Sequence, residues 1–392
     1  MTGQPDTGPL RNVILWSVLV SVVSVNFSVA LSSIAMGTAI GLWLLVLLRS
    51  RGTEFRRTPF DLLFVLYLIA ELSVAVFSQE PANSLVNAKR LILISFVYLS
   101  LYALRTPEDL RLAVVLIVGV CSVTSLIEIF SLSFARGHLQ RLSVFQYFLT
   151  EGGIKMIVFL LGLPLALSKS VPRRLRIWIS AALVPIFTGL VLTQTRSSWL
   201  GLVAGLIVIG LRRYRWIIPA AALLIILFLL AAPRDLTARA VSIFDPAMPS
   251  NLTRIHMVTT GWRMFLDRPF TGFGDVDLRK YYITYIIPLD TAEGGHLHNN
   301  IMMLLVTLGI VGFTIVMTIF VRIAVRMWRT AASREGSALL SAIALGCLAA
   351  FAGFQVNGLF EWNFGDHEIA VLFWFLTGLV LVTERLRAGE AA

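Results

Sequence analysis

The stretch NVILWSVLVSVVSVNFSVALSSIAMGTAIGLWLLVLL at residues 12–48 contains no charged side chain. A helix needs about 20 apolar residues to cross the hydrocarbon core of a bilayer, so this run is long enough for two crossings. We expect a hairpin that turns at Asn26-Phe27-Ser28 and is not cleaved, because further apolar runs follow. The alternative is a cleaved signal segment beginning at Val13, since Ser28-Val29-Ala30 is similar to a cleavage site.

The composition of the whole chain agrees with this beginning. Of its 392 residues, 57% are hydrophobic and only 14% are charged, and the mean hydropathy is +0.82. A soluble domain carries about 25% charged residues. We therefore predict an all-α polytopic integral membrane protein in which residues 1–392 form a single membrane domain. Cys121 and Cys347 lie inside apolar runs, so neither a disulfide framework nor a thiolate metal site is expected.

Twelve ranges have the length and apolar character of a membrane-spanning helix. Between the ninth and tenth ranges, residues 233–298 form the only long polar segment. The twelve predicted spans are 12–28, 29–48, 59–78, 89–104, 110–131, 153–168, 176–194, 197–211, 216–232, 299–321, 336–357 and 367–384.

Basic residues predict the orientation of the chain. When both the N- and C-termini are placed in the cytoplasm, every short cytoplasmic loop is basic, as the positive-inside rule requires. Residues 233–298 then lie on the non-cytoplasmic side, although one missed span would invert part of this assignment. The net charge of +11 is spread between apolar runs, so membrane lipids, and not nucleic acid, are the expected anionic partners.

The polar segment carries more positive charge than the outer side of a membrane protein normally does. It contains seven Lys and Arg residues, and no acid falls between Pro246 and Leu266, where Arg254 and Arg263 lie. Locally unpaired cations on this side indicate an anionic substrate, and a histidine at the membrane boundary indicates proton chemistry.

Arg196 lies in the sequence TQTRSSWLG at residues 193–201, between two long apolar runs. We expect a very short outer turn that leaves Arg196 little freedom, and a guanidinium held there matches a phosphate bidentately. The alternative is an arginine that only extends to the membrane surface, with Trp199 as an interfacial aromatic residue.

Residues 251–265 are predicted to form a helix in the outer segment, with Thr253 as its N-cap. Its apolar residues recur at helical spacing, so we expect this face to lie on the bundle or in the membrane interface. Arg254 flanks the apolar face, whereas His256 and Arg263 lie on the opposite side, where they could simply be solvated. The apolar residues are Ile255, Val258, Trp262 and Phe265.

His298 precedes Asn299 at the start of the tenth predicted span. A neutral imidazole can take a proton from an attacking hydroxyl near neutral pH, and a carboxylate can orient it. The alternative is a polar residue that caps the helix. His296 and His298, with no carboxylate at ligand spacing, give a weak metal signal, so no metal site is expected. The outer acids available to orient the imidazole are Asp290, Glu293, Glu361 and Asp366.

The last outer loop reads NGLFEWNFGDHE at residues 357–368. Aromatic rings stack on sugar rings and acids bind hydroxyl groups, so this loop is typical of a sugar-binding surface. The same acids could instead pair with the outer arginines as a structural network.

Several motifs, taken in order, resemble those of the O-antigen ligase and polymerase family of the bacterial inner membrane. The first is the turn TRSSWLG at 195–201. The second is Arg254, about fifteen residues before PFTGFG at 269–274. The third is His298-Asn299, which leads a helix containing GIVG at 309–312.

The resemblance covers essentially the whole chain in topology, and the terminal LFEWNFGD loop is also similar to that of ligase members. The chain departs from the family pattern at Val258, where a Trp is common, and at Arg268, where a His usually precedes the Pro. In the family, an Arg precedes a Trp in the short turn, a second Arg opens the periplasmic helix, and the functional His precedes Asn. These positions match Arg196, Arg254 and His298.

The resemblance implies a type-C-like, metal-independent and inverting glycosyltransferase, with residues 233–298 in the periplasm and no cofactor. Its donor is a glycan on undecaprenyl diphosphate, and the acceptor of a ligase is the lipid A core. Arg196, Arg254 and Arg263 are the candidates to bind the donor diphosphate, whose charge grows as the glycosidic bond breaks. His298 is the candidate general base. The candidates to position the acceptor or the base are Asn299, Asp290, Glu361 and Asp366.

Other functions stay open. Within the family, a polymerase extends another lipid-linked repeat, and a protein O-glycosyltransferase modifies a polypeptide. The acidic-aromatic last loop and the short chain favour a ligase. A lipid-linked glycan transporter would need charges deep within spans or a repeat between two halves, whereas the charges here cluster at the span ends. A non-catalytic scaffold would need neither Arg196 nor His298.

Overall fold

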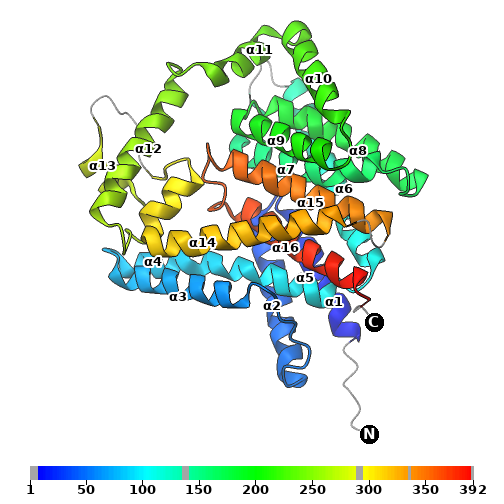
Figure 1. The fold of residues 1–392 in the computed structure, drawn as a ribbon, viewed down its shortest axis with the longest axis horizontal. Coiled ribbons are helices and arrows are strands. Elements are labelled where there is room, and N and C mark those ends of the chain that lie inside the picture. The colour runs from blue at the N-terminus through cyan, green and yellow to red at the C-terminus, as the bar shows by residue number, and fades with distance from the viewer. Residues whose placement is uncertain (1–7, 135–140, 288–294, 334–336, 390–392) are drawn as a thin grey trace.

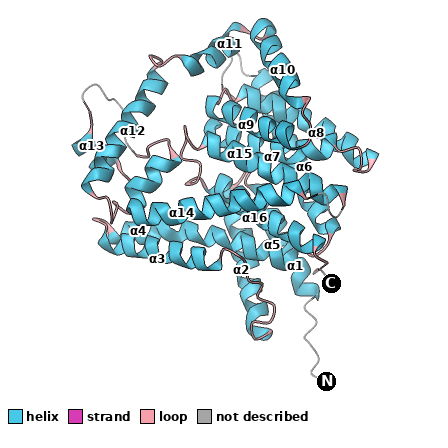
Figure 2. Ribbon diagram, in the orientation of Figure 1, coloured by secondary structure: helices cyan, strands magenta, loops and turns pink. Residues whose placement is uncertain are grey.

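The computed structural model describes residues 8–134, 141–287, 295–333 and 337–389, which fold into helices and loops without a β-strand (Figures 1 and 2). The first half contains α1 (Gly8–Ser24), α2 (Val29–Arg49), α3 (Asp61–Phe77), α4 (Pro81–Asn87), the 3₁₀ helix η1 (Ala88–Ile94), α5 (Ser95–Ala103), α6 (Pro107–Phe134), α7 (Phe148–Leu167) and α8 (Arg173–Leu192). The second half contains α9 (Arg196–Arg212), α10 (Ile217–Ala231), α11 (Arg234–Val241), the 3₁₀ helix η2 (Ser242–Phe244), α12 (Pro249–Asp267), α13 (Arg279–Tyr285), α14 (Asn300–Ala332), α15 (Ala338–Asn357) and α16 (His367–Arg387).

Each predicted span coincides with helical residues, and the prediction of an all-helical polytopic membrane protein is confirmed. Eight helical stretches among the described residues are long and apolar enough to cross a membrane, while α1 and α10 are apolar but shorter. The number twelve therefore stays a prediction. The eight stretches are Val29–Arg49, Pro81–Ala103, Pro107–Ser131, Phe148–Leu167, Arg173–Leu192, Asn300–Ala332, Ala338–Asn357 and His367–Arg387.

The centre of the bundle is formed by α7, α15 and α16, whose residues are mostly buried. Small residues allow close packing there, which is how helices associate when lipid supplies no hydrophobic driving force between them. A Cβ atom added to Gly201 of α9 would lie 2.6 Å from the carbonyl oxygen of Gly353 of α15. This close contact fixes the start of α9, and with it Arg196, against the core.

The helix α14 is longer than the predicted span 299–321 and is interrupted at Gly309, where φ is +63°. The PFTGFG loop of the polar segment docks at this interruption. The amide of Ile310 donates to the carbonyl of Pro269 at 2.7 Å, and the amides of Phe273 and Gly274 donate to α14 carbonyls at 2.9 and 3.0 Å. The polar segment is therefore attached to the bundle through backbone hydrogen bonds.

Three charged side chains of α6 and α7 are buried inside the bundle. Lys155 of α7 contacts Glu128 of α6 at 2.7 Å, and all three side chains of Lys155, Glu128 and Glu151 are almost fully buried. Because each acid lies near a cation, the group has the pairing that buried charges require. Glu128 and Lys155 lie near the ends of the predicted spans 110–131 and 153–168, so the expectation that charges cluster at span ends is not contradicted by this group.

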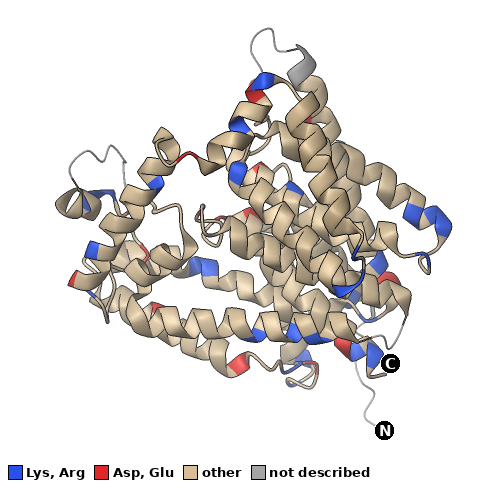
Figure 3. Ribbon diagram, turned by 45° about the horizontal axis from the view of Figure 1, so that its top comes forward, with Lys and Arg blue, Asp and Glu red and all other residues tan. Residues whose placement is uncertain are grey.

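Basic residues from distant parts of the chain meet at one end of the bundle. Arg11 binds Asp109 at 2.5 Å, Arg105 binds Glu54 at 2.9 Å, and Arg326 binds Glu384 at 2.6 Å. Figure 3 shows Lys and Arg gathered near the C-terminus, and a second set along the arch that α10, α11 and α12 form in Figure 1. The loops predicted to be cytoplasmic thus share one end of the molecule.

The helix α12 differs from its prediction at its N-terminus. It begins at Pro249 after an N-cap at Met248, and the Thr253 hydroxyl donates to the carbonyl of Pro249 at 2.9 Å, so Thr253 is not the cap. Of the predicted apolar face, Phe265 is buried and the other three residues are exposed, so a position of this face in the membrane interface stays a prediction. The buried face instead contains Met257, Thr260, Gly261 and Met264, because α12 packs on α14 with the side rich in small and flexible residues.

The predicted orientation can be tested with single cysteines, since the two natural cysteines are buried. Ser143→Cys and Lys280→Cys, both exposed and at the outer end, are expected to react with a membrane-impermeant thiol reagent in whole cells. Thr53→Cys, exposed in a basic loop, is expected to react only after the membrane is opened. The reverse labelling pattern would overturn the orientation.

Candidate active site

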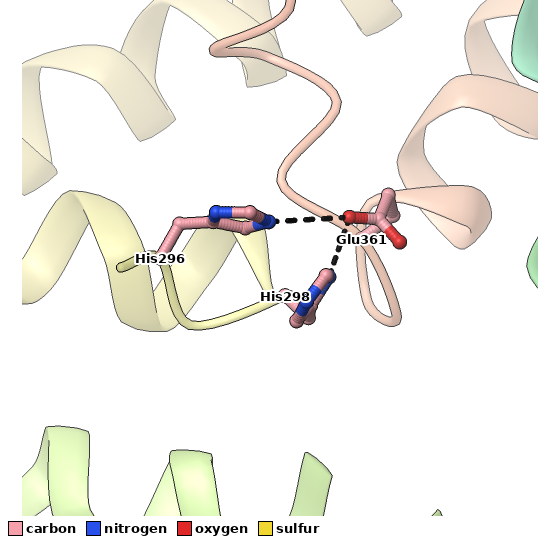
Figure 4. A group of neighbouring side chains, drawn as sticks. All are labelled: His296, His298 and Glu361. Carbon is pink, nitrogen blue, oxygen red and sulfur yellow. Dashed lines mark hydrogen bonds and ion pairs between the residues drawn. The ribbon is translucent and has the colours of Figure 1, made fainter. Parts of the chain in front are cut away.

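His298 and Glu361 form the centre of the candidate site. Nδ1 of His298 lies 2.6 Å from Oε1 of Glu361, although the two residues are 63 positions apart. Figure 4 shows both His296 and His298 directed toward this one carboxylate. A carboxylate on Nδ1 holds an imidazole in one orientation and leaves Nε2 available for proton transfer. The side chain of His298 is one quarter exposed, so a substrate can reach it.

The loops that carry this pair are fixed by asparagines. His298 has a φ of +44°, a left-handed conformation that is uncommon for residues other than glycine. Asn299 caps α14 by accepting from the Met302 amide at 2.9 Å, and its Nδ2 donates to the carbonyl of Leu359 at 2.8 Å. Asn300 donates from its Nδ2 to Asn363 at 2.6 Å. The start of α14 and the loop carrying Glu361 are thereby joined on both sides of the pair.

Arg254 shares the same carboxylate. Its guanidinium lies 3.8 Å from Oε2 of Glu361, and its Nε donates to the carbonyl of Phe360 at 2.9 Å. Burial lowers the pKa of Arg254, although Glu361 opposes this effect. The carboxylate of Glu361 therefore lies between a histidine and an arginine, as expected for an acid that holds both in place.

Arg196 is the first residue of α9, after a turn of three residues, as the sequence predicts. Its side chain is buried and makes four hydrogen bonds of 2.7–3.0 Å with Ser242, Ser250 and Asn251. All the acceptors are uncharged, so the positive charge has no carboxylate partner among them. Because the side chain is enclosed by the polar segment, Arg196 does not extend toward the membrane surface as the alternative proposed.

Two further arginines belong to this group. The pKa of Arg239 is lowered to about 10, first by burial and then by the charges of Arg141, Arg196 and Arg254. The guanidinium of Arg141 lies 4.5 Å from the ring centre of Phe148. The charges of these four guanidinium groups therefore act on one another, with Glu361 as the acid that acts on Arg254. A cluster of positive charge of this kind attracts an anion of several charges. Arg141 and Arg239 were counted from the sequence as outer cations, but no motif distinguished them.

The remaining predicted residues lie apart from this centre. Arg263 is exposed on α12 and is not among the charges that affect Arg196, Arg239 or Arg254. Asp366 precedes α16, and its Oδ2 accepts from the Thr150 hydroxyl at 3.2 Å. Asp290 and Glu293 fall outside the described residues.

The pKa of Asp366 is raised to about 7 by burial and by the negative charges of Glu361 and Glu368. A raised pKa in the folded state means that Asp366 stabilises the fold at acidic pH and that this contribution is lost between about 4 and about 7. We expect Asp366→Asn, which stays neutral, to melt at a higher temperature than the natural protein at pH 8 and to differ little at pH 4. Asp277→Asn, at an exposed site, is the control; equal pH dependence of all three proteins would contradict this prediction.

A metal ion could be held at the same centre. His296, His298 and Glu361 place three ligand atoms within 4.8 Å of one another, because the fold brings in a carboxylate that the local sequence lacks. His296 is about half exposed, and its Nε2 lies 3.9 Å from Oε1 of Glu361. The pKa of His296 is lowered by burial and by the charge of His298, although the charge of Glu361 opposes this effect. Metal-independent chemistry stays a prediction. It would be wrong if His296, His298 and Glu361 bind a metal ion that the reaction requires.

This arrangement can bind an anionic group on its arginines and accept a proton on His298 from a hydroxyl brought beside it. Residues 181–317 match the family model described as O-antigen ligase, and this match spans Arg196, Arg239, Arg254 and His298. No protein with a curated description matches the chain.

Proposed function

We propose that this chain, whose residues 181–317 belong to the O-antigen ligase family, transfers a glycan from undecaprenyl diphosphate to the lipid A core on the periplasmic face of the inner membrane. The observation that carries the proposal is the His298–Glu361 pair, which lies beside Arg254, whose charge in turn acts on Arg196 and Arg239. Members of this family are glycosyltransferase-like ligases and polymerases, and both act on lipid-linked glycans.

In the proposed reaction, the acceptor hydroxyl oxygen attacks the anomeric carbon from the side opposite the diphosphate. The bond between that carbon and the diphosphate oxygen breaks, and its electron pair leaves with the lipid. The hydroxyl proton passes to Nε2 of His298, while Glu361 holds the imidazole that becomes charged. Arg196 and Arg254 stabilise the charge on the leaving diphosphate, with Arg239 and Arg141 adding to the field. The anomeric configuration is inverted.

The acidic-aromatic loop favours a ligase over a polymerase or a protein O-glycosyltransferase. It supplies Glu361 to the site and exposes Leu359 and Phe360 beside it, which gives a sugar acceptor both a polar and an apolar contact. A strain lacking this protein tests the assignment. A ligase predicts loss of all polymer on lipid A together with accumulation of lipid-linked polymer, whereas lipid A carrying a single repeat would show a polymerase instead.

Transfer by the purified protein is expected to survive excess EDTA, because four arginines supply the positive charge that a metal would otherwise provide. The measurement is the rate of glycan transfer before and after chelation, with Mg²⁺, Mn²⁺ or Zn²⁺ added back. Loss of activity that one of these ions restores would mean that His296, His298 and Glu361 bind a metal and that His298 is not the free base.

A further inference from the structure

A second charged group lies behind the site, where α3, η1 and the polar segment meet. Arg90 of η1 binds Glu71 of α3 at 3.3 Å through one terminal nitrogen and Asp275 at 3.3 Å through the other. Glu71 is 2% exposed, and the side chains of Arg90 and Asp275 are only 15% and 13% exposed. One arginine therefore joins two acids from separate parts of the chain.

The guanidinium of Arg90 also reaches the loop that carries Glu361. Its central carbon lies 5.5 Å from the ring centre of Trp362, within the range of a cation–π interaction. Trp362 is buried, directly follows Glu361, and its amide lies 3.3 Å from Oε1 of that residue. The indole also lies against Gly365, where a Cβ atom would overlap the ring nitrogen. Trp362 thus contacts both Arg90 and the backbone of its own loop.

Asp275 in turn links Arg90 to α4. The amide of Asp275 donates to the Ser84 hydroxyl at 3.0 Å, and Asn87 donates to the carbonyl of Asp275 at 2.9 Å. The same stretch of chain continues into the PFTGFG loop that docks at the interruption of α14. Arg90 consequently connects α3, the polar segment and the loop bearing Glu361, and it touches neither His298 nor the four arginines.

From this geometry we infer that Arg90 is a positioning residue. It holds Trp362, and through Trp362 it sets the Glu361 carboxylate at the distance from which that carboxylate orients His298. The inference rests on the proposed function only for the effect on catalysis, since the contact between Arg90 and the loop exists without substrate. A lysine does not replace the guanidinium, because a point charge cannot bind two acids through separate nitrogens while presenting a flat face to an indole.

The test compares Arg90→Gln and Arg90→Lys with Arg105→Gln. Arg105 is a matched control, since it also binds a carboxylate, Glu54, at 2.9 Å and lies 5.2 Å from an aromatic ring, Tyr102, but at the opposite end of the bundle. Arg90→Gln is expected to speed amide hydrogen exchange in residues 357–366 and to lower kcat by about 10²-fold, the cost of misplacing a catalytic group by about 1 Å. Binding of the lipid-diphosphate donor is expected to stay near normal. Arg90→Lys is expected to recover only part of the lost kcat. Arg105→Gln is expected to leave the amide exchange of residues 357–366 unchanged.

Trp362 supplies the second arm of the test. Trp362→Phe keeps an aromatic face and is expected to be mild, whereas Trp362→Leu reproduces the effects of Arg90→Gln. Because both act through one contact, the double variant Arg90→Gln/Trp362→Leu is expected to be no worse than the more severe single variant. Additive losses, or a fall in kcat with unchanged exchange of residues 357–366, would overturn the inference. If Arg90→Gln does not accumulate in the membrane, the two Trp362 variants carry the comparison.

The exchange measurement separates this inference from the proposed function. A natural protein that transfers no glycan would defeat the proposed function, while faster exchange of residues 357–366 in Arg90→Gln would still support the contact. Conversely, an active protein whose Arg90→Gln variant exchanges and turns over normally would overturn the inference alone.

Discussion

Replacing His298 by Ala is expected to lower glycan transfer by about 10²–10⁴-fold, the contribution that a general base typically makes. Donor binding is expected to persist, because the arginines that face the diphosphate are contributed by other elements. The measurement is transfer by the purified protein, together with binding of the undecaprenyl-diphosphate donor to the same preparation.

His296→Ala is the matched control for this prediction. His296 approaches the same carboxylate but lies 3.9 Å from Oε1, compared with 2.6 Å for His298. The loss of transfer activity in His296→Ala is expected to be much smaller than in His298→Ala. The loss in Glu361→Gln is expected to fall between these two, because an amide still accepts a hydrogen bond without carrying charge. Normal turnover by His298→Ala would show that this residue is not the general base.

Arg196→Ala and Arg254→Ala are each expected to lower transfer by about 10²–10³-fold, as observed when a preorganised electrostatic contact to a transition state is removed. The lysine variants are expected to recover only part of the activity, because an ammonium lacks the planar fork that binds two phosphate oxygens. The measurement is the rate of transfer at saturating acceptor, with the amount of protein in the membrane and its melting temperature determined in parallel.

The melting temperature matters because Arg196 also joins α9 to Ser242, Ser250 and Asn251. Lys280→Ala, which removes an exposed outer cation paired with Glu80, is the control for charge alone. Arg263→Ala is expected to be mild, since that guanidinium is exposed on α12. Equal activity of Arg196→Lys, Arg196→Ala and the natural protein would show that Arg196 has only a structural role.

The positions of the helices could be predicted from the sequence because apolar runs end at charged or polar residues. The helices α15 and α16 begin and end within a few residues of the predicted 336–357 and 367–384. The prediction failed for α14, whose last turns contain Arg322, Arg326 and Arg329. Arg326 forms an ion pair with Glu384 of α16, which stabilises the part of α14 that follows the apolar run. Hydropathy does not reveal such a partner.

The site was predictable only where the cue is local. His298 and Arg196 each lie at the start of a helix, and Arg254 lies in the second turn of α12, so their residue types could be interpreted in place. Four outer acids were equally available to orient His298, and only the fold selects Glu361 from 63 residues away. Arg141 and Arg239 remained undistinguished for the same reason, because proximity among four guanidinium groups is a property of tertiary structure.

The contact between the PFTGFG loop and the interruption of α14 has a consequence for transplanting parts of this protein. A side chain on Gly309 would lie 2.5 Å from the Phe270 carbonyl oxygen, and one on Gly272 would overlap the Thr307 carbonyl. The two glycines, on separate stretches of chain, are therefore both needed for this contact. Consider a chimera in which residues 233–298 come from a relative and α14 comes from this protein. We expect it to assemble only if the relative also has glycine at the position of Gly272. An exchanged segment that extends to residue 312 carries both glycines and avoids this requirement.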